Sequence, residues 1–112
     1  MKLSIVKDRS KKMLGAVSFE LKARVELTDE EAGLIKKYKA DKELLLQKEI
    51  PLTGRSIALN ITIGSLMAGQ AFKCDDIAEL LEYEKNVKES CKIFKNYLEV
   101  MRHFGGEEVI EY

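Results

Sequence analysis

The chain has 112 residues, about the length of one globular domain. Hydrophobic residues make up 46% and charged residues 34%, which indicates a folded core and excludes intrinsic disorder. Basic and acidic residues both total 19, so the chain is not a polycation adapted as a whole to nucleic acid or an anionic membrane.

Neither a membrane span nor a signal peptide is predicted. The longest run without a charged residue, 56–72, is too polar and slightly short for a span, which needs about 20 apolar residues. The apolar run at 3–6 is too short for the core of a signal peptide. We therefore expect a soluble cytoplasmic protein with one domain over residues 1–112 and no membrane partner.

The first predicted elements are two strands, residues 3–6 and 16–27, joined as a hairpin. In the second strand apolar and polar residues alternate strictly, which places one face on a core and the other in water. This alternation is typical of an antiparallel sheet with one solvated face. The polar residues 7–12 and Gly15 are interpreted as the connection.

A short helix is predicted over residues 28–38. Thr28 can cap its first free N–H groups, and Glu31, three residues later, completes a capping box. Acidic residues fill its first turn and lysines lie near its end, which suits the helix dipole at both ends.

The middle of the chain predicts three further strands. Residues 43–49 are interpreted as a strand, with a prolonged helix as the alternative, and a proline and a glycine mark the loop that follows. Residues 57–63 alternate between apolar and polar, and residues 70–74 form a short strand. A bend or single helical turn over 64–69 joins the last two.

One long helix is predicted over residues 76–104. Asp76 can cap it, and no glycine or proline interrupts it before Gly105. At about 1.5 Å per residue it extends about 43 Å, whereas a compact sphere of 112 residues is only about 34 Å across. We expect the helix to extend beyond a compact body, and residues 107–112 to form a last edge strand.

Two apolar stripes run along this helix. The first has heptad spacing from Ile77 to Met101 and is apolar at seven of eight positions. The second occupies only the later half: Ile93, Tyr97, Val100 and Phe104. Because one sheet face covers one stripe, the second needs another partner, and we favour a second copy of the chain in a homodimer. The alternative is that the C-terminal strand or the 28–38 helix covers it.

The residues suited to metal binding or nucleophilic catalysis are few. Cys74, Cys91 and His103 are fewer than the four ligands of a structural zinc site, and we predict neither a metal nor a cofactor. Cys74 lies next to a helix N-terminus, but two adjacent aspartates oppose its ionisation. His103 lies about 43 Å along the helix from Cys74, too far for a dyad within one subunit. No catalytic residue is predicted.

Basic residues gather near the N-terminus. Residues 1–25 carry seven bases against two acids, a net of +5, and residues 75–112 carry ten acids against five bases, a net of −5. The basic hairpin suits phosphate contact, although such clusters more often keep a sheet edge soluble. The candidate nucleic-acid contacts are Lys7, Arg9, Lys11, Lys12, Lys22 and Arg24.

The predicted fold is α+β: an antiparallel sheet of about five or six strands, with one short helix and one long C-terminal helix packed across it. The function we favour is a small, non-catalytic, self-associating domain that presents a surface to a protein partner. A nucleic-acid-binding module that uses the basic hairpin is the alternative. An enzyme with a site formed at a subunit interface is the third hypothesis.

Overall fold

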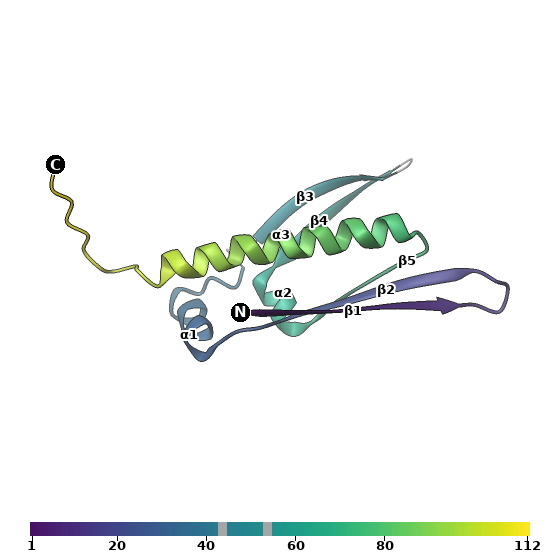
Figure 1. Cartoon of the computed structure of the whole chain (residues 1–112), viewed down its shortest axis with the longest axis horizontal. Helices are drawn as coiled ribbons and strands as arrows, with labels where there is room; N and C mark the ends of the chain where they lie inside the picture. The colour runs from purple at the N-terminus through teal and green to yellow at the C-terminus, as the bar shows by residue number, and fades with distance from the viewer. Residues whose placement is uncertain (43–44, 53–54) are drawn as a thin grey trace.

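The computed structural model describes residues 1–42, 45–52 and 55–112. The elements in chain order are β1 (Lys2–Lys11), β2 (Val17–Glu26), α1 (Asp29–Tyr38), β3 (Leu45–Leu52), β4 (Arg55–Thr62), α2 (Ile63–Ala68), β5 (Gln70–Cys74) and α3 (Ile77–Met101). The molecule measures 68 × 29 × 21 Å, with α3 lying along its length and the C-terminal tail beyond the end of α3 (Figure 1). It is therefore far longer than a compact sphere of the same chain length.

The α+β class is confirmed, but the single sheet of five or six strands is wrong. Sheet A has three antiparallel strands in the order β1-β2-β5, and sheet B is the antiparallel hairpin β3-β4. Helix α2 begins directly after β4, where Thr62 and Ser65 form a capping box with N–H to hydroxyl distances of 2.9 and 3.2 Å. Helix α2 lies between β4 and β5 in the chain and packs beside β2. It therefore separates β4, which belongs to sheet B, from β5, which belongs to sheet A.

Two strand predictions need their bounds corrected. Strand β3 confirms the strand interpretation of 43–49, although residues 43–44 lie outside the described residues. It continues to Leu52, so Pro51 belongs to the strand and not to the predicted loop. Strand β1 continues to Lys11, so the polar residues 7–11 are strand and not the predicted loop. They pair with β2 in register, Lys7 opposite Leu21 and Lys11 opposite Val17, because backbone ladders form regardless of side-chain polarity.

The core lies where α3 crosses sheet A. Alternate residues of β2, including Leu21, are buried on the face that α3 covers. The heptad stripe of α3 packs there, and Phe94 has no exposed surface. Of its eight positions only Ile77, in the first turn, is exposed, at 51%. The first stripe thus meets the sheet as the heptad spacing predicts.

Helix α1 begins as predicted, and its cap also holds the start of β1. The Glu31 N–H donates to Thr28 Oγ1 at 3.2 Å, and the Thr28 N–H donates to Glu31 Oε1 at 3.0 Å. The α-amino group of Met1 lies 2.7 Å from the same carboxylate oxygen. Burial acts to raise the pKa of Glu31, but the Met1 ammonium and the Thr28 groups outweigh it and hold that pKa below its usual value.

The C-terminal end differs from the prediction in two ways. Helix α3 ends at Met101 and not at residue 104, and short turns follow in which the Phe104 N–H donates to the Met101 carbonyl at 3.2 Å. Residues 107–112 form no strand. Gly105 has a φ of 81°, and beyond it the tail leads away from the body, where it meets no strand edge (Figure 1).

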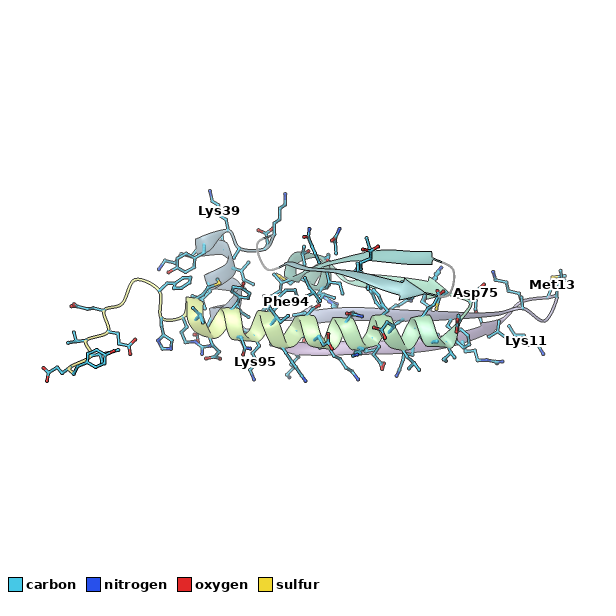
Figure 2. All side chains as sticks on the ribbon, turned by 90° about the horizontal axis from the view of Figure 1, so that it is seen from above. Lys11, Met13, Lys39, Asp75, Phe94 and Lys95 are labelled. Carbon is cyan, nitrogen blue, oxygen red and sulfur yellow. The ribbon has the colours of Figure 1, made fainter. Side chains whose placement is uncertain are left out.

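The position of Phe94 yields a first prediction. Figure 2 shows Phe94 directed into the body and its neighbour Lys95 directed away from it. Phe94→Ala should lower the free energy of unfolding by about 3–5 kcal/mol, because it leaves a cavity under α3. Lys95→Ala should change it by less than about 0.5 kcal/mol. Urea unfolding followed by circular dichroism measures both, and similar losses for the two variants would contradict this core assignment.

Candidate self-association surface

The helix face that carries the second apolar stripe continues towards the start of α3 with two polar residues, Asn86 and Ser90. Positions 86, 90, 93, 97 and 100 follow at spacings of three or four and so lie on one face of the helix, and Phe104, in the turns after Met101, continues the same spacing. The exposed fractions along it are Asn86 0%, Ser90 0%, Ile93 38%, Tyr97 52%, Val100 55% and Phe104 50%. Thus the two polar residues are buried and the four apolar residues are exposed.

The neighbours of α3 explain why only the first half of this stripe is covered. Around the helix, Glu84 contacts Lys7 of β1, and Tyr83 stacks on Phe72 of β5 with ring centroids 4.4 Å apart. Sheet A ends at β5. The hairpin β3-β4 lies alongside the earlier part of α3, which includes Asn86 and Ser90, and does not extend to the C-terminal end of the helix (Figure 1). The hairpin therefore covers the early part of the stripe and leaves the later part open.

The two buried polar residues satisfy part of their hydrogen bonding within their own helix. The Asn86 side-chain amide donates to the Glu82 carbonyl at 2.7 Å, and the Ser90 hydroxyl donates to the Asn86 carbonyl at 2.7 Å. The Asn86 Oδ1 and the Tyr83 hydroxyl have no hydrogen-bond partner among the described residues. Burying such groups carries a free-energy cost, while the apolar residues two turns later stay in contact with water.

The exposed residues form a shallow surface, which we call the apolar patch: Ile93, Tyr97, Val100 and Phe104. Together with Asn96 they line a hollow of about 320 Å³. The ring of Tyr38 on α1 meets Phe104 edge-on, with centroids 5.4 Å apart and planes at 89°. Helix α1 therefore touches one end of the patch and does not cover it, contrary to the alternative in which the 28–38 helix hides the stripe.

Ion pairs hold α1 beside the end of α3. The Arg102 guanidinium donates to the Glu30 carboxylate of α1 and, at 2.9 Å, to the Glu99 carboxylate one turn earlier in α3. His103 is exposed next to Arg102. Arg102 and Glu30 thus link the end of α3 to α1 beside the patch.

The structure does not bring the six predicted basic residues together. In sheet A the alternation places Lys7, Arg9 and Lys11 on the α3 side of β1, whereas Lys22 and Arg24 lie on the opposite side of β2. Lys12 lies at the turn, where its carbonyl accepts the Gly15 N–H at 3.0 Å. Lys7 is also engaged, with its ammonium 2.9 Å from both Glu84 carboxylate oxygens.

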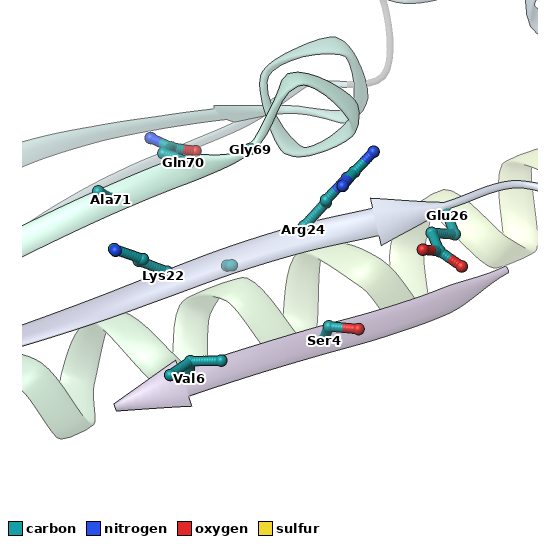
Figure 3. A pocket seen from close by; sticks show the side chains of 9 residues that line it. Ser4, Val6, Lys22, Arg24, Glu26, Gly69, Gln70 and Ala71 are labelled. Carbon is teal, nitrogen blue, oxygen red and sulfur yellow. The ribbon is translucent and has the colours of Figure 1, made fainter. Parts of the chain in front are cut away.

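A second hollow, of about 500 Å³, lies on the face of sheet A away from α3 (Figure 3). Lys22, Arg24 and Glu26 project from β2 beside it, and Ser4 and Val6 from β1. A carboxylate accompanies the cations, and Lys22 also lies 3.5 Å from the Glu20 carboxylate. The hollow is therefore of mixed charge and not a strongly positive phosphate site.

Neither cysteine has the environment of a reactive thiol. Burial raises the pKa of the Cys91 thiol to about 11. Burial also raises the pKa of Cys74, assisted by the charges of Glu79 and the two adjacent aspartates, although hydrogen bonding from the Asp76 backbone acts against this. The opposition of the aspartates to ionisation is as expected from the sequence.

The described residues offer neither a metal-binding cluster nor a membrane-spanning helix. No group of three His, Cys, Asp or Glu side chains among them is placed to hold a metal ion. No helix in the described part of the chain is long and apolar enough to cross a membrane. Comparison with known protein families, with curated proteins and with solved structures found no match to this chain.

The ion pair between Lys7 and Glu84 predicts a pH-dependent stability. The Lys7 ammonium lowers the pKa of Glu84 in the folded protein, so the pair stabilises the fold above the unfolded pKa of about 4.3 and is lost as the pH falls through the folded pKa. Lys7→Met should cost about 1 kcal/mol at pH 7, because Lys7 is half exposed, and almost nothing at acid pH. Urea titrations at both pH values measure this.

The control for this experiment is Lys11→Met, on the same strand and the same face. It should change the free energy of unfolding little at either pH. A loss for Lys7→Met that is equal at pH 7 and at acid pH would show that packing of the lysine stem, and not the ion pair, is responsible.

The two thiols should differ in alkylation. With a pKa of about 11, Cys91 is almost wholly protonated at pH 8, and it is also buried, so iodoacetamide should leave it unmodified in the native protein. Cys74 should react first, and both should react in urea. Mass spectrometry after timed quenching measures this, and prompt native labelling of Cys91 would mean that α3 opens readily.

Proposed function

We propose that the chain is a small, non-catalytic protein-interaction domain that self-associates through the apolar patch. One observation carries this proposal: along one face of α3 and the turns that follow it, Asn86 and Ser90 are fully buried while four apolar residues stay 38–55% exposed. In an isolated molecule the hydrophobic effect favours the reverse order. A partner that covers the later half of this face would bury the four apolar residues as well.

The patch has the self-complementary order that a two-fold dimer requires. If two copies of α3 meet antiparallel with their patches in contact, the axis passes between residues 98 and 99. Ile93 then lies opposite Phe104 of the second copy, and Tyr97 lies opposite Val100. Each pair joins an aliphatic residue to an aromatic one, which suits interdigitation across a helix pair.

The exposed area sets the expected strength of this contact. From the exposed fractions, the patch offers roughly 350 Å² of side-chain surface in each copy. Two patches together bury roughly 700 Å², below the ~1,200 Å² at which stable interfaces begin. The patch alone therefore supports a weak, reversible dimer, and a tighter one needs further surface.

Sedimentation equilibrium with patch variants tests the proposal. The wild-type chain should associate into dimers at about 100 µM or below, and Tyr97→Glu should raise the dissociation constant at least about 100-fold, because it buries an unpaired charge. Phe104→Glu should also weaken association, although its contact with Tyr38 makes it the less specific variant. Unchanged far-ultraviolet circular dichroism would show that the variants fold.

Met13→Glu is the matched control. Met13 is equally apolar and fully exposed, but it lies at the tip of the β1-β2 turn, at the other end of the molecule from the tail (Figure 2). This variant should associate as the wild type does. A wild-type chain that stays monomeric at 100 µM, or equal weakening by Met13→Glu and Tyr97→Glu, would overturn the proposed function.

A further inference from the structure

Two unpartnered features of the body lie side by side: the outer edge of β1 and an apolar pair on α3. Strand β1 pairs with β2 and with no other strand among the described residues, so its second edge is unpaired. The apolar pair is Ile77 and Leu81, which are 51% and 54% exposed. An unpaired edge offers backbone N–H and C=O groups to an added strand, and exposed apolar residues beside it can cover that strand's side chains.

The turn of α3 places the apolar pair on the side of β1 that faces away from β2. Glu84 marks the direction of β1, because it contacts Lys7, and Tyr83 marks the direction of β5, because it stacks on a ring of that strand. Tyr83 lies about 100° around the helix from Glu84. In the opposite direction Ile77 lies about 20° and Leu81 about 60° from Glu84. The pair therefore flanks the position, about 4.8 Å beyond β1, that a fourth strand would take.

The tail beyond α3 has the composition that this position requires. Three of its side chains are exposed: Val109 at 75%, Ile110 at 60% and Tyr112 fully. The acidic residues among them are Glu107, Glu108 and Glu111. In an extended strand, residues 107, 109 and 111 share one face and residues 108, 110 and 112 the other, so each face carries acidic and apolar side chains.

We propose that the tail of a second copy adds to the outer edge of β1 as a fourth, antiparallel strand of sheet A. In the register with the best charge agreement, the pairs on the α3 side are Glu107–Lys11, Val109–Arg9 and Glu111–Lys7. The pairs on the other side are Glu108–Ser10, Ile110–Asp8 and Tyr112–Val6. A shift by two residues in either direction keeps only one of the two ion pairs.

The level along α3 agrees with this register. Strand β1 runs towards the start of α3, and Lys7 is level with Glu84 (Figure 1). Arg9, two residues further along β1, is about 7 Å nearer the start of α3, which corresponds to four or five helix residues. Val109, opposite Arg9, is therefore level with the apolar pair. An apolar side chain of the tail thus arrives where the body has apolar side chains exposed.

The cations of β1 select an acidic strand. Two β1 edges would place like charges opposite each other, so the edges of two copies do not pair. The tail places Glu111 beside Lys7, which Glu84 already contacts. Lys88 lies 3.7 Å from Glu84 and about 40° further towards the added strand, so two cations face the two carboxylates.

Copies arranged head to tail satisfy the strand direction. In Figure 1 β1 runs towards the hairpin turn, and the tail leads away from the opposite end of the molecule in the opposite direction. A second copy of the same orientation, placed beyond the turn, therefore brings its tail antiparallel along β1. In this register its residues 105 and 106 are level with the turn, so its body begins beyond it. The contact is heterologous and repeats along the long axis.

The tail cannot make this contact within its own copy. Leu81 lies 20 residues before Met101, about 30 Å along α3. Val109 lies eight residues after Met101, a separation of at most about 28 Å in a fully extended chain, and residues 102–104 are coiled in turns. The contact therefore needs a second copy, and because it does not involve the apolar patch it is independent of the patch dimer.

Disulfide trapping tests the contact and its register. One chain carries Arg9→Cys and the other Val109→Cys, both with Cys74→Ser to remove a native thiol and with Tyr97→Glu to remove the patch contact. At about 1 mM and under mild oxidation, the mixed disulfide should form at least about tenfold faster than with Ile110→Cys in place of Val109→Cys. The reason is that residue 110 faces the opposite side of the added strand. Non-reducing gel electrophoresis with mass spectrometry measures both rates.

A charge exchange tests the same register by sedimentation equilibrium, again with Tyr97→Glu present. Glu107→Lys and Lys11→Glu should each raise the dissociation constant about fivefold, because attraction between the facing residues becomes repulsion. An equimolar mixture of the two should recover the original association, since each tail then meets an opposite charge. Glu108→Lys is the matched control, and mixing it with Lys11→Glu should restore nothing.

The outcomes separate this inference from the proposed function. Equal trapping rates for Val109→Cys and Ile110→Cys, or a charge-exchanged mixture that does not recover association, would overturn the added strand whether or not the patch dimer stands. Register-specific trapping together with a patch that fails its own test would leave the added strand as the self-association contact of this chain.

Discussion

The arrangement of this protein follows from the packing of one rigid helix against a narrow sheet. Helix α3 has 25 residues and carries apolar side chains on two faces, whereas sheet A has only three strands. Helix α3 contacts β2 and β5, and the heptad stripe, which includes Phe94, is buried apart from Ile77. Because a sheet face covers one side of a helix, the second face depends on whatever else the chain supplies. The chain supplies a two-stranded hairpin, which is shorter than the helix.

Electrostatics explains how a polar strand remains part of this core. The second half of β1 consists mostly of charged residues, yet it pairs along its whole length with β2. On the side facing α3, Lys7 meets Glu84, the one polar position of the heptad stripe. The buried carboxylate gains a partner, and the edge strand keeps cations that oppose pairing with other sheets. The charge that suggested nucleic-acid contact in the sequence thus has a structural use at Lys7.

Local signals in the sequence predicted the elements more successfully than their assembly. The alternation in β2, the capping box of Thr28 and the heptad stripe of α3 are short-range patterns, and each produced the expected element. The division into two sheets depends on α2, which the sequence predicted only as a bend or single helical turn over 64–69, without the capping box of Thr62 and Ser65. The prediction of a strand at 107–112 is wrong. A strand needs a neighbouring strand with which to pair, and the tail leads away from the body and lies beside none.

The same distinction applies to the candidate surface. Spacing alone located Ile93, Tyr97, Val100 and Phe104, because four apolar residues on one helix face are visible in sequence. Asn86 and Ser90 belong to the same face but were missed, since polar residues carry no hydrophobic signal. Only the position of the hairpin reveals that they are buried and the apolar residues exposed. The hairpin lies beside the polar half of the stripe and leaves the apolar half exposed, which is why we propose a partner for the exposed half.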